Sequence, residues 1–235
     1  MDNKQIRLSV IVPVYNEVAT IGEILRKVRA QKINGVAIEI VVVDDGSKDG
    51  TRDFLDRNPH LYDIFLKNPK NLGKGGAVKN ALAKATGDYV LFQDADLEYD
   101  PDEYESLLFP VLKFGADIVI GSRLTGVKWT RVYYFWHKIG NTFITTWFNI
   151  FYSTTWTDIY SCYLLYRRNL VLASDLRTTG WQQHAEILSK ACLRGKKFYE
   201  VPVSYNGRTY EEGKKIHWYH VVNVLLTIFR FRFLS

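Results

Sequence analysis

Residues 89–98 read Tyr89-Val90-Leu91-Phe92-Gln93-Asp94-Ala95-Asp96-Leu97-Glu98. The β-branched and aromatic residues that open this stretch predict a buried strand. Asp94 and Asp96 follow at alternate positions, so both carboxylates leave an extended backbone on the same face. Open α/β sheets bind their ligands at the carboxyl ends of strands, and oxygen donors there favour Mg²⁺ or Mn²⁺ that carries a diphosphate.

The alternative interpretation of these acids is a cap on the following helix. Asp100-Pro101-Asp102-Glu103 already supplies an N-cap residue, a proline at the first helical position and further acids. Asp94, Asp96 and Glu98 are therefore not needed as caps and remain available for a metal and a diphosphate.

The composition indicates one large hydrophobic core. The chain has 235 residues, 47% of them hydrophobic, and a net charge of +6 spread along the sequence. This charge suits anionic substrates and an anionic membrane surface, and no basic block of the kind that binds nucleic acid is present. Cys162 and Cys192 have neither zinc-site nor disulfide-framework spacing. A strand begins by about residue 6 without a preceding signal segment, so we expect a cytoplasmic protein.

Strands and helices alternate through the first half of the chain. Strand patterns at residues 6–14, 38–43 and 62–66 are followed by helical patterns at 20–31, near 54–55 and at 71–85. This alternation predicts an α/β fold with a mostly parallel sheet flanked by helices. Aromatic residues crowd into 129–156, and we expect strands at 161–166 and 197–205 and a helix at 182–193 to build the acceptor side.

Two motifs indicate nucleotide chemistry. Asp44 and Asp45 end a strand beside a glycine turn, where carboxylates accept hydrogen bonds from a ribose or a base. A turn capped by Ser47 and Asp49 is the alternative. Residues 73–76, Gly-Lys-Gly-Gly, match neither a P-loop nor a Rossmann fingerprint. They nevertheless predict backbone N–H groups and the Lys74 charge at a helix N-terminus, suited to a diphosphate, with a solvated turn as the alternative.

The order of these motifs is more specific than any one of them. The chain carries Pro13-Val14-Tyr15-Asn16-Glu17, Asp44-Asp45-Gly46-Ser47, Gly73-Lys74-Gly75, Asp94-Ala95-Asp96, Gly121-Ser122-Arg123 and Val201-Pro202-Val203. In this order it resembles the family 2 glycosyltransferases with the GT-A fold. Residues 94–101, 157–163 and 205–216 are similar to bacterial members of the branch that contains dolichyl-phosphate mannose synthase and polyprenyl-phosphate glucose synthases. The resemblance implies a GT-A domain over residues 1–212 and a C-terminal amphipathic helix over 213–235.

The resemblance also assigns site residues. It implies a nucleotide-sugar site formed by Pro13, Tyr15, Glu17, Asp44, Asp45, Lys74 and Asp94. It implies that Asp94, Asp96 and Glu98 hold the metal. Catalytic roles fall to Asp96, Arg123, Arg208 and Lys214, with Arg123 facing the transferred sugar or the acceptor phosphate and the last two closing over the phosphates. Residues 136–141 depart from the acceptor motif of mannose synthases, which leaves the acceptor contacts open.

The reaction that follows from the resemblance is an inverting transfer of a hexose from a UDP- or GDP-linked donor to a polyprenyl phosphate, undecaprenyl or dolichyl. An ionised phosphate acceptor needs no strong general base. A glycan or protein hydroxyl acceptor would need one, and Asp158 and Glu186 are the candidates, against a loop hydrogen bond and a solvated helix face. A non-catalytic nucleotide-sugar-binding or membrane-docking module is the alternative of another class.

Two segments suit a membrane surface, although neither has the roughly 20 uninterrupted apolar residues that span a bilayer. A helix over 132–152 would place Phe143, Trp147, Ile150 and Phe151 near one face, with Thr142, Thr145, Asn149 and Ser153 near another. Apolar positions from Trp218 to Phe229 are followed by Arg230-Phe231-Arg232-Phe233. We expect peripheral association with the cytoplasmic face of the membrane. Packing on the core, or on a partner subunit of a homo-oligomer, is the alternative.

Overall fold

The computed structural model describes residues 5–126, 129–132, 134–208 and 220–234. Its centre is a seven-stranded sheet in the order β3-β2-β1-β4-β6-β5-β7. All neighbouring strands are parallel except β6, which is antiparallel to both β4 and β5. The strands are β1 (Ile6–Val14), β2 (Val36–Asp44), β3 (Ile64–Lys67), β4 (Tyr89–Phe92), β5 (Ile118–Ser122), β6 (Leu164–Arg167) and β7 (Phe198–Pro202).

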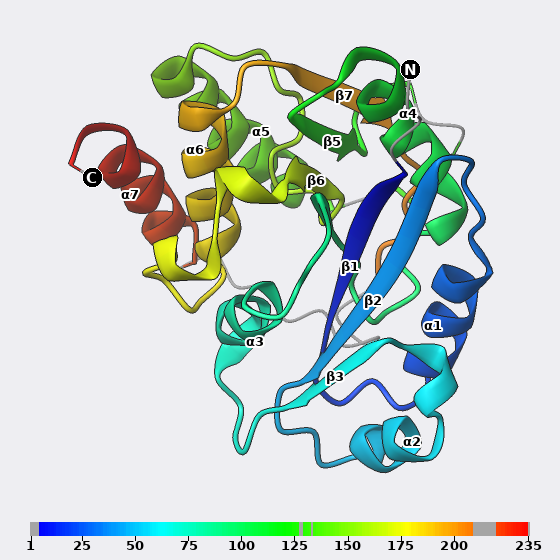
Figure 1. The fold of residues 1–235 in the computed structure, drawn as a ribbon. Helices are drawn as coiled ribbons and strands as arrows, with labels where there is room; N and C mark the ends of the chain where they lie inside the picture. Colours follow the sequence, from blue (N-terminus) through cyan, green and yellow to red (C-terminus); the bar gives the residue numbers. More distant parts are fainter. Residues whose placement is uncertain (1–4, 127–128, 133, 209–219, 235) are drawn as a thin grey trace.

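Helices cover both faces of this sheet. Figure 1 shows α1 and α4 on one side of the central strands and α3, α6 and α7 on the other. The helices are α1 (Ile21–Ala30), α2 (Thr51–Arg57), α3 (Gly73–Leu82), α4 (Tyr104–Phe114), α5 (Phe135–Tyr152), α6 (Gln183–Arg194) and α7 (His220–Phe233), with short 3₁₀ turns at Pro59–Leu61, Pro101–Glu103, Arg168–Leu170 and Ala173–Asp175. The predicted α/β fold with a mostly parallel, helix-flanked sheet is confirmed.

The strand order shows which edge of the sheet is expected to bind ligands. β2 lies on one side of β1 and β4 on the other, so the chain reverses its direction of progress at β1. Val14 pairs with Asp44, and Ile11 pairs with Phe92, which brings the carboxyl ends of the three strands to one edge. A crevice at such a switch point is where open α/β sheets bind ligands.

Local sequence signals explain several boundaries. The predicted first strand coincides with β1, whose residues Leu8, Val10, Ile11 and Val12 are fully buried. The predicted cap also forms, since the Asp100 side chain accepts a hydrogen bond from the Asp102 backbone N–H at 3.2 Å. Because Asp100 caps the next turn, the acids at the end of β4 have other roles.

In the second half of the chain, two helices differ from what the sequence pattern predicted. α5 begins at Phe135 rather than at 132, and its buried residues are Ile144, Thr145 and Phe148. Thr145, expected on a polar face, is 3% exposed because its hydroxyl accepts a hydrogen bond from the Ile159 N–H, whereas Ile150 is 69% exposed. The helix lies where the sequence predicted one; Thr145 from the expected polar face is buried, whereas Phe143 and Ile150 from the expected apolar face are exposed.

α7 packs against α5 and α6. Val224, Ile228 and Phe231 form its buried side, while Val222 and Phe229 from the predicted apolar stripe are exposed. Trp218 and the predicted domain boundary at 212/213 lie outside the described residues. Among the residues that are described, no helix is long and apolar enough to cross a membrane.

Candidate active site

The turns after β1 and β2 are tied to each other. Asn16 has a left-handed backbone (φ 54°), and its side-chain oxygen accepts a hydrogen bond from the Lys48 N–H at 2.8 Å. The Glu17 N–H donates to the Thr51 hydroxyl at 3.0 Å, and the Asp49 carboxylate accepts from the Val18 N–H at 3.0 Å. These bonds fix the edge of the sheet where a nucleoside is expected.

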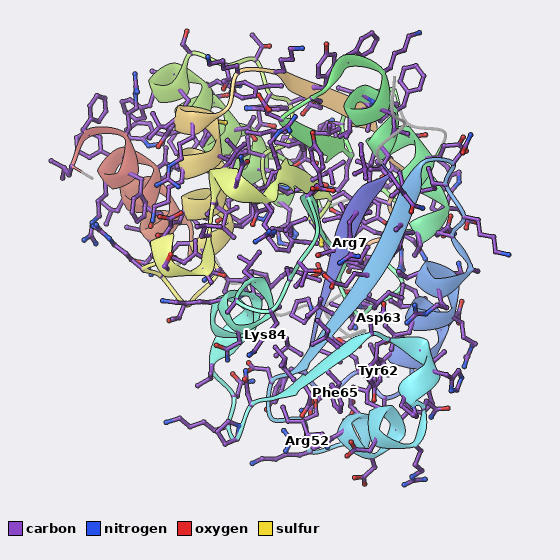
Figure 2. All side chains as sticks on the ribbon, in the orientation of Figure 1. Arg7, Arg52, Tyr62, Asp63, Phe65 and Lys84 are labelled. Atoms are coloured by element: carbon purple, nitrogen blue, oxygen red, sulfur yellow. The ribbon has the colours of Figure 1, made fainter. Side chains whose placement is uncertain are left out.

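Asp44 and Asp45 lie on this edge and are both buried. One oxygen of Asp44 accepts from Arg52 at 2.6 Å and the other from the Ser47 N–H at 3.2 Å. Arg52 belongs to the first turn of α2, at the lower edge of the molecule in Figure 2. A single oxygen of Asp45 accepts from the Asn68 amide and the Leu72 N–H, and its second oxygen has no hydrogen bond among the described residues. Both acids therefore hold local turns, and their role in nucleoside binding stays a prediction.

At the end of β4, Asp94 forms an ion pair with Lys74 from the first turn of α3, at 2.5 Å. Burial acts to raise the pKa of Asp94, but the Lys74 ammonium outweighs it and holds this pKa below its usual range. The same attraction overcomes burial at Lys74 and raises the pKa of its ammonium. Both groups are therefore charged near neutral pH.

Asp96 is held by a different cation. A terminal nitrogen of Arg208 lies 2.7 Å from the Asp96 carboxylate and 3.0 Å from that of Glu17. Burial, together with the nearby charges of Asp94 and Glu98, raises the pKa of Asp96 to about 7. Glu17 shares the Arg208 guanidinium with Asp96, and its expected place in the nucleoside pocket stays a prediction.

Glu98 fixes the segment that carries Arg208. Its carboxylate accepts from the Tyr205 hydroxyl at 2.8 Å and from the Arg208 backbone N–H at 2.7 Å. Its backbone oxygen accepts from the Asn206 N–H at 2.9 Å. Glu98 therefore orients residues 205–208, and its predicted role as a metal ligand stays a prediction.

The donor set fits a divalent cation that shares its coordination with a substrate. Within the described part of the chain, no three His, Cys, Asp or Glu side chains are grouped to hold a metal by themselves. Asp94 and Asp96 offer carboxylate oxygens, which form ion pairs with Lys74 and Arg208 respectively. Mg²⁺ is commonly held by one or two carboxylates plus substrate phosphates, so these two residues would suffice, and their role as metal ligands stays a prediction.

Arg123 enters the site from the end of β5 as part of a buried ion pair. Its Nε and one Nη bind the two carboxylate oxygens of Asp158 at 2.6 and 2.7 Å, and its guanidinium lies 5.1 Å from the centre of the Tyr205 ring. The Asp158 side chain is 0% exposed. Because Asp158 is fully engaged, it positions Arg123 and has no free oxygen facing a substrate.

Glycines bring α3 close to the opposite wall. A Cβ atom on Gly75 would lie 2.3 Å from the backbone oxygen of Thr179, so only glycine allows this approach. The Gly-Lys-Gly-Gly stretch thus serves packing between α3 and the 177–182 loop, and it also presents Lys74 to the site. Neither the diphosphate interpretation nor the solvated-turn interpretation of the sequence included this contact.

Glu186 on α6 holds the same loop. Its two oxygens accept from the N–H groups of Arg177 and Thr178, both at 2.8 Å, and it pairs with Lys190 at 2.5 Å. The expectation of a solvated helix face for Glu186 is wrong, because its side chain is 0% exposed. These bonds to the loop and to Lys190 lower the pKa of Glu186 even though burial opposes them.

These elements surround one pocket with a cavity volume of about 160 Å³. Six charged side chains that the sequence singled out meet in its wall: Lys74, Asp94, Asp96, Glu98, Arg123 and Arg208. Five others do not line it: Pro13, Tyr15, Glu17, Asp44 and Asp45. Lys214 lies outside the described residues.

The remaining wall has an aromatic part that was not assigned to the site from the sequence. It includes Phe92, Tyr160, Trp181 and His184. The Lys74 ammonium lies 5.7 Å from the centre of the Trp181 ring. The sequence carries no signal for these residues beyond an isolated Gly-Trp pair and a single histidine in a helical pattern, because the pocket forms only when α3, β4 and α6 pack together.

The fold has close counterparts among solved structures. Glucosyl-3-phosphoglycerate synthase from Mycobacterium tuberculosis, in complex with Mn²⁺, uridine diphosphate and glucosyl-3-phosphoglycerate, matches with a TM-score of 0.72 over 98% of this chain and 81% of that one, at 20% identity. The same enzyme with Mg²⁺ and uridine diphosphate gives 0.70 over 98% and 80%, at 19% identity. At this identity the likeness establishes the shared fold.

Sequence comparison identifies the family. Residues 9–172 match the model of glycosyl transferase family 2, and the chain belongs to this family. It is 30% identical over 218 residues to a low-salt glycan biosynthesis hexosyltransferase of Haloferax volcanii, covering 91% of this chain and 52% of the relative. It is 29% identical over 217 residues to a dolichol-phosphate mannosyltransferase of Pyrococcus furiosus, covering 88% and 59%. The chain thus spans little more than half the length of these curated relatives.

Proposed function

We propose that this protein transfers a hexose from a nucleoside-diphosphate sugar to a polyprenyl phosphate, with inversion at the anomeric carbon and with Mg²⁺ or Mn²⁺ on the donor diphosphate. The observation that carries the proposal is the arrangement of Lys74, Asp94, Asp96 and Arg208 around one pocket. Two carboxylates and two cations at a strand end suit a metal-bound diphosphate that must leave with negative charge. Membership in glycosyl transferase family 2 supports a sugar donor.

The acceptor class is argued from the two carboxylates that were candidates for a general base. Asp158 and Glu186 do not line the pocket, and the contacts of their carboxylates hold Arg123 and the 177–178 backbone. A hydroxyl acceptor must lose a proton to a group within hydrogen-bond reach, whereas a phosphate monoester near neutral pH is already ionised. Among the described residues, Asp94, Asp96 and Glu98 do line the pocket, but their ion pairs and hydrogen bonds, or a bound divalent cation, would occupy their oxygens. His184 also lines it, and its pKa of about 4 makes its ring a weak base. The geometry therefore favours a phosphate acceptor over a glycan or protein hydroxyl.

The proposed reaction is a single displacement. An acceptor phosphate oxygen forms a bond to the anomeric carbon while the bond from that carbon to the donor diphosphate breaks, and the nucleoside diphosphate leaves with the electron pair. Lys74 and Arg208 stabilise the charge that develops on the leaving group, and Arg123 orients the acceptor phosphate. Asp94 and Asp96 would hold the cation, which acts as a Lewis acid on the diphosphate when bound.

A lipid acceptor requires contact with a bilayer, and we assign this contact to α5 and α7. Exposed apolar side chains gather on the two helices, which pack on each other: Trp136, Ile139, Phe143 and Ile150 on α5, and Val222, Leu226, Phe229 and Phe233 on α7. Arg230 and Arg232 are exposed among the α7 residues. Apolar and aromatic side chains beside arginines suit the interface of an anionic membrane.

The test is transfer from a panel of UDP- and GDP-hexoses in detergent, with and without a polyprenyl phosphate, in Mn²⁺ or Mg²⁺ and then in EDTA. We expect nucleoside diphosphate release that needs both metal and lipid phosphate and is lost in Asp96→Asn. Release that ignores the lipid would favour a hydroxyl or water acceptor. Donor binding without any turnover would favour a binding module.

A further inference from the structure

Glu200 on β7 holds the loop that carries Asp158. One oxygen of its carboxylate accepts hydrogen bonds from the backbone N–H groups of Thr157 and Asp158, at 2.9 and 3.2 Å, and the other accepts from the Thr157 N–H at 3.2 Å. The hydroxyls of Thr157 and Ser122 lie 2.6 Å apart, which ties the loop to the end of β5 as well. Glu200 does not line the pocket, so its effect on a substrate must pass through this loop.

The loop in turn fixes Arg123. The Asp158 carboxylate accepts from the Arg123 backbone N–H at 3.1 Å, in addition to its bonds with Nε and one Nη of the same residue. One carboxylate therefore holds both the backbone and the guanidinium of Arg123. Because Glu200 binds the backbone N–H of Asp158, the direction of the guanidinium depends on both acids in series.

Arg123 keeps one terminal nitrogen for a ligand. Its second Nη makes no hydrogen bond with the residues that the structure describes, and it is not among the buried polar atoms that lack a partner. This nitrogen therefore retains accessible surface, and the whole side chain is 10% exposed. Since Arg123 lines the pocket, the free N–H groups are available to an anion there. A guanidinium that is held at two points presents its remaining edge in one direction.

The arrangement brings two carboxylates to one loop. Burial raises the pKa of Glu200 and the Asp158 charge adds to this rise, while the N–H groups of Thr157 and Asp158 oppose it. Charge attraction thus does not explain a second acid beside Asp158. What the second acid contributes is a fixed backbone at residues 157–158.

We propose that Glu200 is a positioning residue for the acceptor, because it fixes the backbone of the 157–158 loop and so sets the direction in which Arg123 meets the acceptor phosphate. Without Glu200, Asp158 and Arg123 stay paired but shift together. A displacement of 1 Å in a group that orients a reactant can lower a rate by roughly 10²-fold. This inference rests on the proposed function, because it assumes an anionic acceptor at Arg123.

The test compares two quantities on folded protein: kcat/KM for undecaprenyl phosphate, and the dissociation constant of the nucleoside-diphosphate hexose in Mn²⁺. In Glu200→Ala, we expect kcat/KM for the lipid to fall about tenfold, less than for a full 1 Å displacement, while donor binding stays unchanged. Glu200→Gln should keep most of the activity, because its amide oxygen can replace the oxygen that accepts from both N–H groups. Glu200→Thr, with a side chain suited to a strand, is a second variant that cannot reach the loop.

A double-mutant cycle separates positioning from a general loss of stability. Arg123→Lys keeps a positive charge but lacks the planar fork that binds both oxygens of Asp158. In this background, Glu200→Ala should lower kcat/KM for the lipid much less than in the wild type. A loss that comes from stability alone would be the same in both backgrounds.

Glu39 on β2 offers a matched control. Its carboxylate likewise accepts from a backbone N–H, that of Thr86 at 2.9 Å, and it does not line the pocket. Glu39→Ala should leave kcat/KM for the lipid unchanged when activity is expressed per folded protein. Unchanged kcat/KM in Glu200→Ala and Glu200→Thr, or an equal loss in the Arg123→Lys background, would overturn the role of Glu200 while the transfer proposal stands. A wild type that transfers no hexose to the lipid phosphate would overturn both.

Discussion

Arg208 lies 2.7 Å from Asp96, although 112 positions separate the two residues in the sequence. The same guanidinium also binds Glu17, so one cation joins the turn after β1 to the end of β4. Arg208 thus places its positive charge at the carboxylate that a donor-bound cation would use. Binding of that cation must compete with Arg208 or move it toward the diphosphate.

Replacing Arg208 therefore has opposite effects on two measurements. In Arg208→Ala, we expect Mn²⁺ to bind about tenfold more tightly in the absence of donor, because Asp96 and Glu17 lose the competing cation. Tenfold corresponds to about 1.4 kcal/mol, close to the lower end of the range of about 1.5–3 kcal/mol for hydrogen bonds to charged groups. Turnover should fall, since a group that stabilises the leaving diphosphate is lost. Mn²⁺ binding can be followed by electron paramagnetic resonance, with Arg208→Lys as the charge-preserving comparison. Weaker Mn²⁺ binding in the alanine variant would refute the competition.

Glu186 should prove structural and not catalytic. Glu186→Gln leaves Lys190 buried without its carboxylate, and breaking a buried pair typically costs about 3–5 kcal/mol. We expect a loss of this size in the free energy of unfolding, measured with urea, and unchanged stability in the exposed control Glu23→Gln. Turnover of the folded variant should fall much less than the 10²–10⁴-fold expected for a lost general base. A loss in that range, with stability retained, would reinstate Glu186 as the base.

Gly75 and Gly140 offer a matched pair of helical glycines. Gly75→Ala forces a Cβ against the Thr179 backbone oxygen and should destabilise the protein by about 1–3 kcal/mol, the usual cost of overpacking. It should also weaken donor binding, because the 177–182 loop and Lys74 must move apart. Gly140→Ala on α5 meets nothing within 4 Å and should stabilise the protein by about 0.5–1 kcal/mol. Urea unfolding and donor calorimetry measure both effects. Equal stability in the two variants would show that the approach of α3 to Thr179 is not tight.

His184 should make the free energy of unfolding depend on pH between about 4 and 6.5. Its pKa in the folded protein is about 4, below the ordinary value of 6.5, so the unfolded chain binds more protons between these limits. The neutral ring therefore contributes stability that is complete above about pH 6.5 and is lost as the pH falls toward 4. We expect the slope of unfolding free energy against pH in this window to be shallower in His184→Gln than in the wild type. The matched change His60→Gln, at an exposed site, should leave the slope as it is. An identical slope in all three proteins would contradict the shift at His184.

The apolar surface on α5 and α7 can be tested with vesicles. Leu226 on α7 is 62% exposed and Leu112 on α4 is 45% exposed, and the two helices lie on different sides of the sheet (Figure 1). Leu226→Glu should reduce flotation with phosphatidylglycerol vesicles severalfold, because a charge enters the lipid-facing side. Leu112→Glu should float like the wild type. Equal flotation of all three proteins would remove α7 from the membrane contact.

Much of the framework was readable from local sequence. The apolar run that became β1, the alternation of strands and helices, and the cap at Asp100 depend on residues a few positions apart. The same is true of Asp94 and Asp96, whose place after β4 follows from the run before them. The antiparallel insertion of β6 between β4 and β5 was not predicted, because strand order is decided by contacts between distant segments.

The sequence by itself determined the fold class, the family resemblance and the strand end that carries the acids, because these rest on residue periodicity and motif order. Only the tertiary structure decided the partners of those acids: Arg208 for Asp96 and Lys74 for Asp94. It also decided that Glu186 is buried and that His184 becomes part of the pocket wall. Ion pairs, burial and exposure depend on which surfaces meet when helices pack on a sheet, and residue spacing along one element does not specify them.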